Sequence, residues 1–137
     1  MPAKSSAARR MMAPGITLAV LASATAYTAL ADPYQRGFFP SCIFLASSGH
    51  WCPGCGGLRA VHELARGDAA AALGMNPVVV LLIIPLGIAL LVAWIRAAWR
   101  GRPAPSVPIW LAVGLPALLF IFWIVRNIPV LEPYLAP

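Results

Sequence analysis

Charged residues are scarce in this sequence, and acidic residues are the scarcest of all. Only 10% of the 137 residues are charged, and four residues in all are Asp or Glu. A soluble domain has about 25% charged residues. The sequence has no carboxylate pair for acid–base catalysis, no catalytic triad, no phosphate-binding loop and no dinucleotide-binding fingerprint. These absences give no support for an enzyme and favour a non-enzymatic protein.

Apolar residues are abundant instead. They make up 61% of the chain, whereas a soluble domain has roughly 45–50%. A chain of 137 residues has room for one domain, and it is too small to bury this much apolar surface in a water-soluble core. We therefore expect a single membrane domain over residues 1–137, with the lipid bilayer covering the apolar surface that the fold leaves exposed.

Three apolar segments have about the 20 residues that a membrane-spanning helix needs. They cover residues 14–31, 77–95 and 109–125. Asn76 is a good N-cap and Pro77 fits the first helical position, so both mark the start of the second span. Pro85 predicts a kink within that span. The sequence thus predicts an all-α membrane protein with three transmembrane helices.

The basic residues predict how these spans are oriented. Six of them lie before the first span or between the second and the third: Lys4, Arg9, Arg10, Arg96, Arg100 and Arg102. The other side receives four: Arg36, Arg59, Arg66 and Arg126. The positive-inside rule therefore favours a cytoplasmic N-terminus and an extracytoplasmic loop over residues 32–75. The net charge of +6 forms no patch with interleaved aromatics, so we expect no nucleic-acid partner.

The first span has a second interpretation. Residues 4–31 also resemble a secretory signal peptide, with a basic start, an apolar run and an Ala29-Leu30-Ala31 cleavage pattern. Retention as a helix is the favoured reading. Both outcomes place residue 32 and those after it on the extracytoplasmic side of the membrane.

The segment 32–75 divides into two parts. Its first part carries aromatics among prolines and glycines, and we expect it on the membrane surface. Its second part predicts helices over 58–66 and 68–73, with Gly67 ending the first, Asp68 capping the second and Gly74 closing it.

Polar residues form a continuous stripe on the first of these helices: Arg59, His62, Glu63 and Arg66. This pattern favours an amphipathic helix in the headgroup plane, and the alternative is that Arg59 and His62 line a pocket with cysteines. Arg126-Asn127, at the end of the third span, similarly favours an interfacial anchor over a buried polar pair.

The chain has three cysteines, Cys42, Cys52 and Cys55. An odd number cannot form a closed disulfide framework, and any one of the three possible pairs could be bonded outside the cytoplasm. Trp51 followed by Cys-x-x-Cys resembles a redox dithiol, but Gly56-Gly57 delay the helix that would activate it and no thioredoxin-like pattern surrounds it. We therefore favour a structural cysteine motif, with thiol redox chemistry as one alternative.

Metal binding is the other alternative for these cysteines. Cys42, Cys52, Cys55 and His62 together form a Cys₃His set that zinc accepts, with iron as a second candidate and His50 as another fourth ligand. The favoured reading is that the protein has no cofactor.

The ordered motifs resemble a known bacterial family. The stretch HWCPGCGGLRA, a following histidine, Gly67-Asp68, and Asn76-Pro77 before an apolar span are similar to the family called domain of unknown function 2752. Pro40-Ser41-Cys42 and Arg126-Asn127-Ile128-Pro129 also fit, so the resemblance covers about residues 32–133. The motif residues carried over are Cys42, Cys52, Pro53, Cys55, Gly56, Arg59, Ala60, Gly67, Asp68, Asn76 and Pro77.

This resemblance implies a small multi-pass protein of the bacterial plasma (inner) membrane, without an assigned role. Two functional hypotheses follow. The first is a non-enzymatic module that packs against partner membrane proteins through its amphipathic helix and through small residues of the first span, including Gly15, Ala19 and Ser23. Its cysteines would stabilise the loop. The second is a membrane-tethered thiol redox or metal-binding protein that uses Cys52 and Cys55.

Overall fold

The computed structural model of the chain describes residues 7–35, 37, 39 and 41–137. Lys4 and Arg36, which entered the orientation argument, and Pro40 of the upstream motif lie outside the described residues. The described part is mostly helical and contains no strand. Its elements are α1 (Ala7–Leu30), α2 (Ile43–Ser48), α3 (Gly57–Ala65), α4 (Ala69–Met75), a π-helical turn η1 (Val79–Ile83), α5 (Ile84–Trp99), α6 (Ile109–Arg126) and α7 (Glu132–Leu135).

Within the described residues, three helices are long and apolar enough to cross a membrane, which confirms the predicted fold class. They run over Ala7–Leu30, Val79–Trp99 and Ile109–Arg126. The first begins at Ala7 and not at Pro14, because good helix formers precede the proline and the helix continues through it. This continuation leaves out one backbone hydrogen bond.

The irregularity expected at Pro85 lies just before it in the chain. Residues Val79–Ile83 form a π-helical turn, and Pro85 occupies the first turn of α5. A proline lacks the N–H that an α-helix needs from an interior residue, and a π-turn is one of the common ways in which a helix accommodates such a defect.

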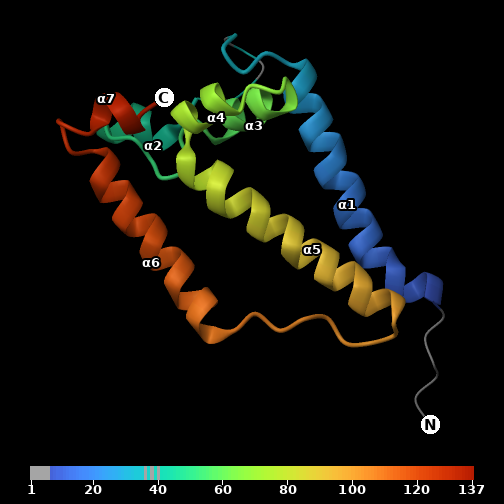
Figure 1. Cartoon of the computed structure of the whole chain (residues 1–137). Helices are drawn as coiled ribbons and strands as arrows, with labels where there is room; N and C mark the ends of the chain where they lie inside the picture. Colours follow the sequence, from blue (N-terminus) through green and yellow to red (C-terminus); the bar gives the residue numbers. More distant parts are fainter. Residues whose placement is uncertain (1–6, 36, 38, 40) are drawn as a thin grey trace.

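The spans are arranged unequally around the molecule. α1 packs against α5 and, near its C-terminal end, against α3. α6 stands apart from this pair and is joined to α5 by the extended linker 100–108 (Figure 1). The short helices α2, α3, α4 and α7 gather at the opposite end of the spans from this linker (Figure 1). We call this the cysteine end, since the cysteines precede α2 and α3.

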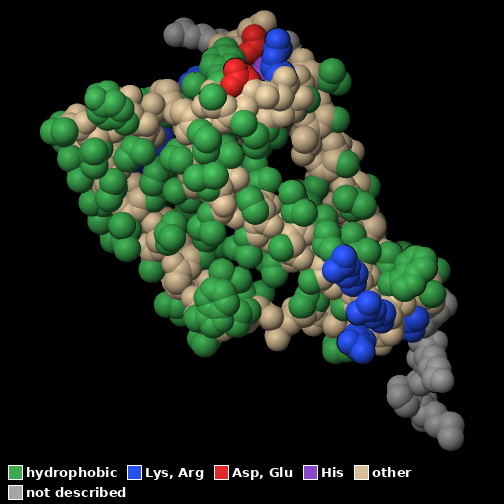
Figure 2. Space-filling view, in the orientation of Figure 1, with side chains coloured by type: hydrophobic (Ala, Val, Ile, Leu, Met, Phe, Trp, Pro, Cys, Tyr) green, Lys and Arg blue, Asp and Glu red, His purple; other side chains and the backbone are tan. Residues whose placement is uncertain are grey.

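Charges are also divided between the two ends. All four acidic residues lie at the cysteine end. Asp32 follows α1, Glu63 lies on α3, Asp68 lies between α3 and α4, and Glu132 begins α7. Five described arginines lie at the linker end: Arg9, Arg10, Arg96, Arg100 and Arg102. Figure 2 shows a group of basic side chains at one end of the apolar surface, and acidic side chains with a few basic ones beside them at the other.

Candidate functional site

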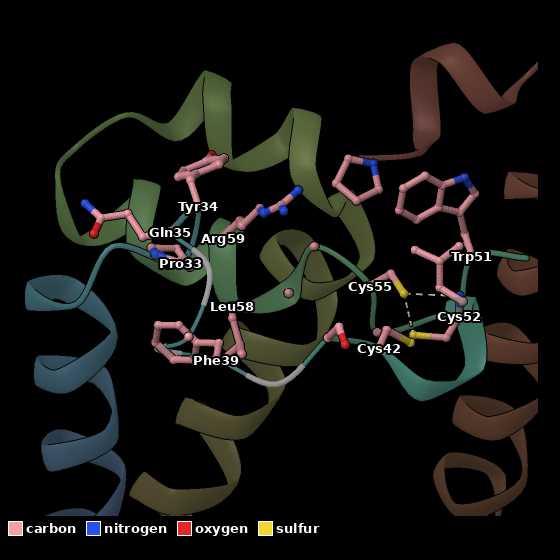
Figure 3. Close-up of a pocket in the computed structure, with 17 residues that line it drawn as sticks. Pro33, Tyr34, Gln35, Phe39, Cys42, Trp51, Cys52, Cys55, Leu58 and Arg59 are labelled. Atoms are coloured by element: carbon pink, nitrogen blue, oxygen red, sulfur yellow. Dashed lines mark hydrogen bonds between the residues drawn. The ribbon is translucent and has the colours of Figure 1, made fainter. Parts of the chain in front are cut away.

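The three cysteines converge at the cysteine end. Cys42 precedes α2, whereas Cys52 and Cys55 lie in the turn before α3. Their three sulfur atoms all lie within 4.8 Å of one another. Cys52 Sγ is 2.8 Å from Cys55 Sγ, and the backbone N–H of Cys52 donates to Cys55 Sγ at 3.3 Å. All three are free thiols (Figure 3).

Gly56 allows the chain to turn from Cys55 into α3. Its φ is +80°, in the left-handed region that favours glycine. A Cβ at this position would collide with the carbonyl oxygen of Met75. The backbone at the end of α4 therefore approaches the cysteine turn more closely than a residue with a side chain at position 56 would permit.

Asn76 connects this turn to the second span. It is fully buried, and its Oδ1 accepts from the N–H of Val79 at 3.1 Å, which confirms the predicted N-cap. Its Nδ2 donates to the carbonyl oxygens of Pro53 and Cys55, each at 3.0 Å. The capping role followed from the sequence, whereas the two bonds to the cysteine turn did not.

α4 begins after its predicted cap, Asp68, but it ends later than the predicted stop at Gly74. Asp68 Oδ1 accepts from the N–H of Ala71 at 2.8 Å, and Gly67 before it has a φ of +86°. Gly74 does not close the helix, which continues to Met75. The predicted stop at Gly74 is therefore wrong, because the helix ends where Asn76 turns inward.

Arg126 binds the cysteine turn from the far end of the chain. It is 0% exposed, and Nη1 donates to the carbonyl oxygens of Cys52 at 3.0 Å and Cys55 at 3.2 Å. Nη2 donates to the carbonyl oxygen of Leu135 at 2.9 Å. The interpretation of Arg126 as an interfacial anchor is wrong, because the guanidinium is buried inside the protein, where it satisfies these carbonyls.

Asn127 contacts the residue before the cysteine motif. Its Oδ1 accepts from the N–H of Trp51 at 2.8 Å, and its Nδ2 donates to the carbonyl oxygen of Trp51 at 2.9 Å. The indole of Trp51 donates to Glu132 Oε1 at 3.0 Å. The end of α6 and the start of α7 thus hold the cysteine turn by its backbone and by Trp51.

The polar stripe of α3 is divided between two environments. His62 is 4% exposed, and its Nδ1 lies 2.8 Å from the carbonyl oxygen of Thr28 in α1. The headgroup-facing orientation expected for the whole stripe is therefore wrong for His62, because this face packs on α1. Arg66, at the other end of the stripe, is exposed.

The structure separates the two histidines from the sulfur cluster. His62 faces α1, and His50 is exposed with Nδ1 2.8 Å from the carbonyl oxygen of Ser48. Among the described residues, the group that brings possible metal ligands together consists of the three cysteines alone. Of the predicted set of four ligands, three come together and His62 does not.

The environments of two thiols differ strongly. Burial, together with the neighbouring thiols of Cys52 and Cys42, raises the pKa of Cys55 to about 12. The backbone N–H of Leu45, at the start of α2, lowers the pKa of Cys42. The cluster thus combines a buried thiol that holds its proton with a more accessible one that loses it more readily.

A cavity of about 700 Å³ lies next to the three sulfurs. Its wall includes Tyr34, Gln35, Phe39, Leu58 and Arg59 (Figure 3). The guanidinium of Arg59 lies 5.0 Å from the centre of the Tyr34 ring, and the Tyr34 hydroxyl donates to Glu63 Oε1 at 2.8 Å. Arg59 therefore lines a pocket with the cysteines, whereas His62, which the same interpretation placed there, does not line the cavity.

The resemblance to a known family is confirmed for the central part of the chain. The family described as Protein of unknown function (DUF2752) matches residues 42–95. The match contains the three cysteines, α3, α4 and the second span, whereas Arg126 and Asn127 lie beyond it. No curated protein and no solved structure matches the chain.

Proposed function

We propose that this multi-pass membrane protein binds one thiophilic metal ion through Cys42, Cys52 and Cys55, with zinc as the first candidate. The observation that carries the proposal is the convergence of three sulfurs within 4.8 Å. Zinc–thiolate bonds of about 2.3 Å place two sulfurs of a tetrahedral site about 3.8 Å apart. Small side-chain rotations would bring the three sulfurs to that spacing.

The charge of the surroundings supports the same proposal. Three thiolates around a divalent ion carry one net negative charge, and a buried charge needs compensation. Arg126 donates to the carbonyl oxygens of both Cys52 and Cys55, so a buried positive charge lies directly beside the cluster. In the described part of the chain Arg126 pairs with no carboxylate, which leaves its charge available to a thiolate site.

The number of ligands distinguishes zinc from an iron–sulfur cluster. Iron–sulfur clusters are commonly held by four cysteines, or by cysteines and histidines together. The chain has three cysteines, and both histidines bond elsewhere. A mononuclear ion therefore fits better than a cluster, and the proposal replaces the expectation that the protein has no cofactor.

This proposal keeps part of the first functional hypothesis. A bound ion would stabilise the cysteine turn without any reaction, so the protein would remain a non-enzymatic module. Gly15, Ala19 and Ser23 are exposed on α1, which leaves this small-residue face available to a partner membrane protein.

Thiol redox exchange is a second candidate, favoured by one distance. Cys52 Sγ and Cys55 Sγ are 2.8 Å apart, close enough to form a disulfide after a small movement. In that case the Cys55→Ser variant, expressed in cells, should accumulate a mixed disulfide between Cys52 and another protein. A metal site predicts no such adduct.

Elemental analysis of the detergent-purified, reduced protein tests the proposed function. We expect one zinc ion per chain, and loss of most of this zinc in Cys42→Ser, Cys52→Ser and Cys55→Ser. His50→Gln is the matched control, because His50 is exposed and bonds outside the cluster. A wild-type protein that holds no metal while all three thiols react with a thiol reagent would refute the proposal.

The distribution of charge supports a proposed orientation in a bacterial inner membrane. Five described arginines lie at the linker end, and the positive-inside rule places that end in the cytoplasm. The cysteine end would then face the extracytoplasmic side, where oxidising conditions favour cysteines that are bonded to each other or protected by a metal.

A further inference from the structure

The cavity beside the cysteines has two chemically different parts. Three sulfurs lie on one part of its wall, and the cationic side chain of Arg59 lies on another (Figure 3). Phe39 and Leu58 contribute apolar surface to the same wall. A volume of about 700 Å³ is within the range of small-molecule sites, which bind ligands of several to tens of atoms.

Arg59 is a cation without a carboxylate partner in the described part of the chain. Glu63, four residues later on the same helix, accepts from the Tyr34 hydroxyl instead. The guanidinium of Arg59 lies over the Tyr34 ring, which supports its position but provides no negative charge. The planar guanidinium is suited to two parallel hydrogen bonds with a carboxylate.

Coordination chemistry adds a requirement at the other part of the wall. Zinc in a protein site takes about four ligands, and the described part of the chain brings together three cysteine sulfurs. Neither histidine is placed to supply the fourth. A ligand from solution must therefore complete the coordination, and the cavity is the space that adjoins all three sulfurs.

We propose that the cavity binds a small thiol that also carries a carboxylate. Its sulfur completes the coordination of the ion held by Cys42, Cys52 and Cys55, and its carboxylate bonds to Arg59. The thiol releases its proton to solvent when the sulfur–metal bond forms and displaces a bound water, so no oxidant or reductant takes part. This inference rests on the proposed metal binding and names the ligand of that same site.

The test uses the full-length protein in detergent, with cobalt(II) in place of zinc. Cobalt absorption in the visible region reports the number and the kind of ligands around the ion. We expect 3-mercaptopropionate to increase the sulfur-to-cobalt absorption at one cobalt per chain, with tighter binding than its neutral analogue 3-mercapto-1-propanol. Cobalt content is measured after each addition, to separate binding from removal of the ion.

Substitution of the arginine tests the second contact. Arg59→Gln should weaken binding of 3-mercaptopropionate by about tenfold, the effect of losing one charge-assisted hydrogen bond. The affinity for 3-mercapto-1-propanol should not change. Arg66→Gln is the matched control, because Arg66 follows α3 but is exposed and lies outside the cavity wall.

The outcomes separate this inference from the proposed function. A protein that binds no cobalt refutes both. A protein that binds one cobalt through the three cysteines, but whose spectrum responds to neither thiol, keeps the metal site and refutes the ligand. Equal affinity for the two thiols, or equal effects of Arg59→Gln and Arg66→Gln, refutes the contact between the carboxylate and Arg59.

Discussion

Arg126 is the residue whose surroundings differ most from its sequence context. It ends an apolar span, where arginines commonly extend to the lipid headgroups. Here it is completely buried and donates to three backbone carbonyls, two in the distant cysteine turn and one in the nearby helix α7. Its planar fork allows Nη1 and Nη2 to reach different acceptors at once, which a lysine ammonium cannot do with the same geometry.

This geometry predicts the effect of Arg126→Lys. The charge is kept, but the variant cannot bond to Cys52, Cys55 and Leu135 together, so buried carbonyls lose their donors. We expect the free energy of unfolding in detergent to fall by about 1–3 kcal/mol, measured from the loss of helical circular dichroism on heating. Arg66→Lys, at an exposed position, is the control. Equal stability of the two variants would show that the bonds of Arg126 contribute little.

The role of Arg126 could not be predicted because its partners are remote in the sequence. The carbonyls of Cys52 and Cys55 precede it by more than seventy residues, and no local pattern reports which buried backbone lacks a donor. Burial of a polar pair was one of two readings of Arg126-Asn127, and hydropathy alone favoured the other. The spacing of Cys42 from the Cys-x-x-Cys motif likewise allowed the three cysteines to meet, but it did not predict that they do.

At the scale of single elements, the third span and α3 were the most predictable. The third span was expected over 109–125 and runs over Ile109–Arg126, because an uninterrupted apolar run has one stable state in lipid. α3 was also predicted within a residue or so at each end. The sequence did not predict which face of α3 packs on α1. Periodicity defines a polar stripe, but it does not define the element on which the stripe packs.

The junction between α4 and the second span has two roles that substitution can separate. Asn76→Ala removes the N-cap of the span and both donors to the cysteine turn, so we expect a loss of about 2–4 kcal/mol. Asn76→Ser keeps a capping oxygen without adding a charge and loses the amide donors, and it should be intermediate. Thermal unfolding in detergent measures both variants.

Asp68→Ala is the control for this series. Asp68 caps α4 with one exposed hydrogen bond and has no bond to the cysteine turn, so its loss should cost only about 1 kcal/mol. If Asn76→Ala were no more destabilising than Asp68→Ala, the bonds to Pro53 and Cys55 would contribute nothing measurable.

At the scale of the whole molecule, the separation of charges is the dominant feature. Five described arginines lie at the linker end and three at the cysteine end, where all four acidic residues also lie (Figure 2). Reversal of the orientation would move five described arginines across the bilayer, which the positive-inside rule disfavours.

Labelling of introduced cysteines tests the proposed orientation. In a background where Cys42, Cys52 and Cys55 are serine, Ala70→Cys on α4 should react with a membrane-impermeant maleimide in intact cells. Ser106→Cys in the linker should react only after the cells are permeabilised. The opposite pattern would place the linker outside and refute the orientation.

The bonds from Arg126 and Asn127 to the cysteine turn also have a consequence for biogenesis. A chain is inserted from its N-terminus, so the cysteines reach the membrane surface well before α6 has been made. Until α6 crosses and brings its C-terminal end beside them, the carbonyls of Cys52 and Cys55 lack the guanidinium that they bond to in the finished protein. Completion of the thiol site thus depends on insertion of the last span, and a chain arrested after α5 would display cysteines without a finished site.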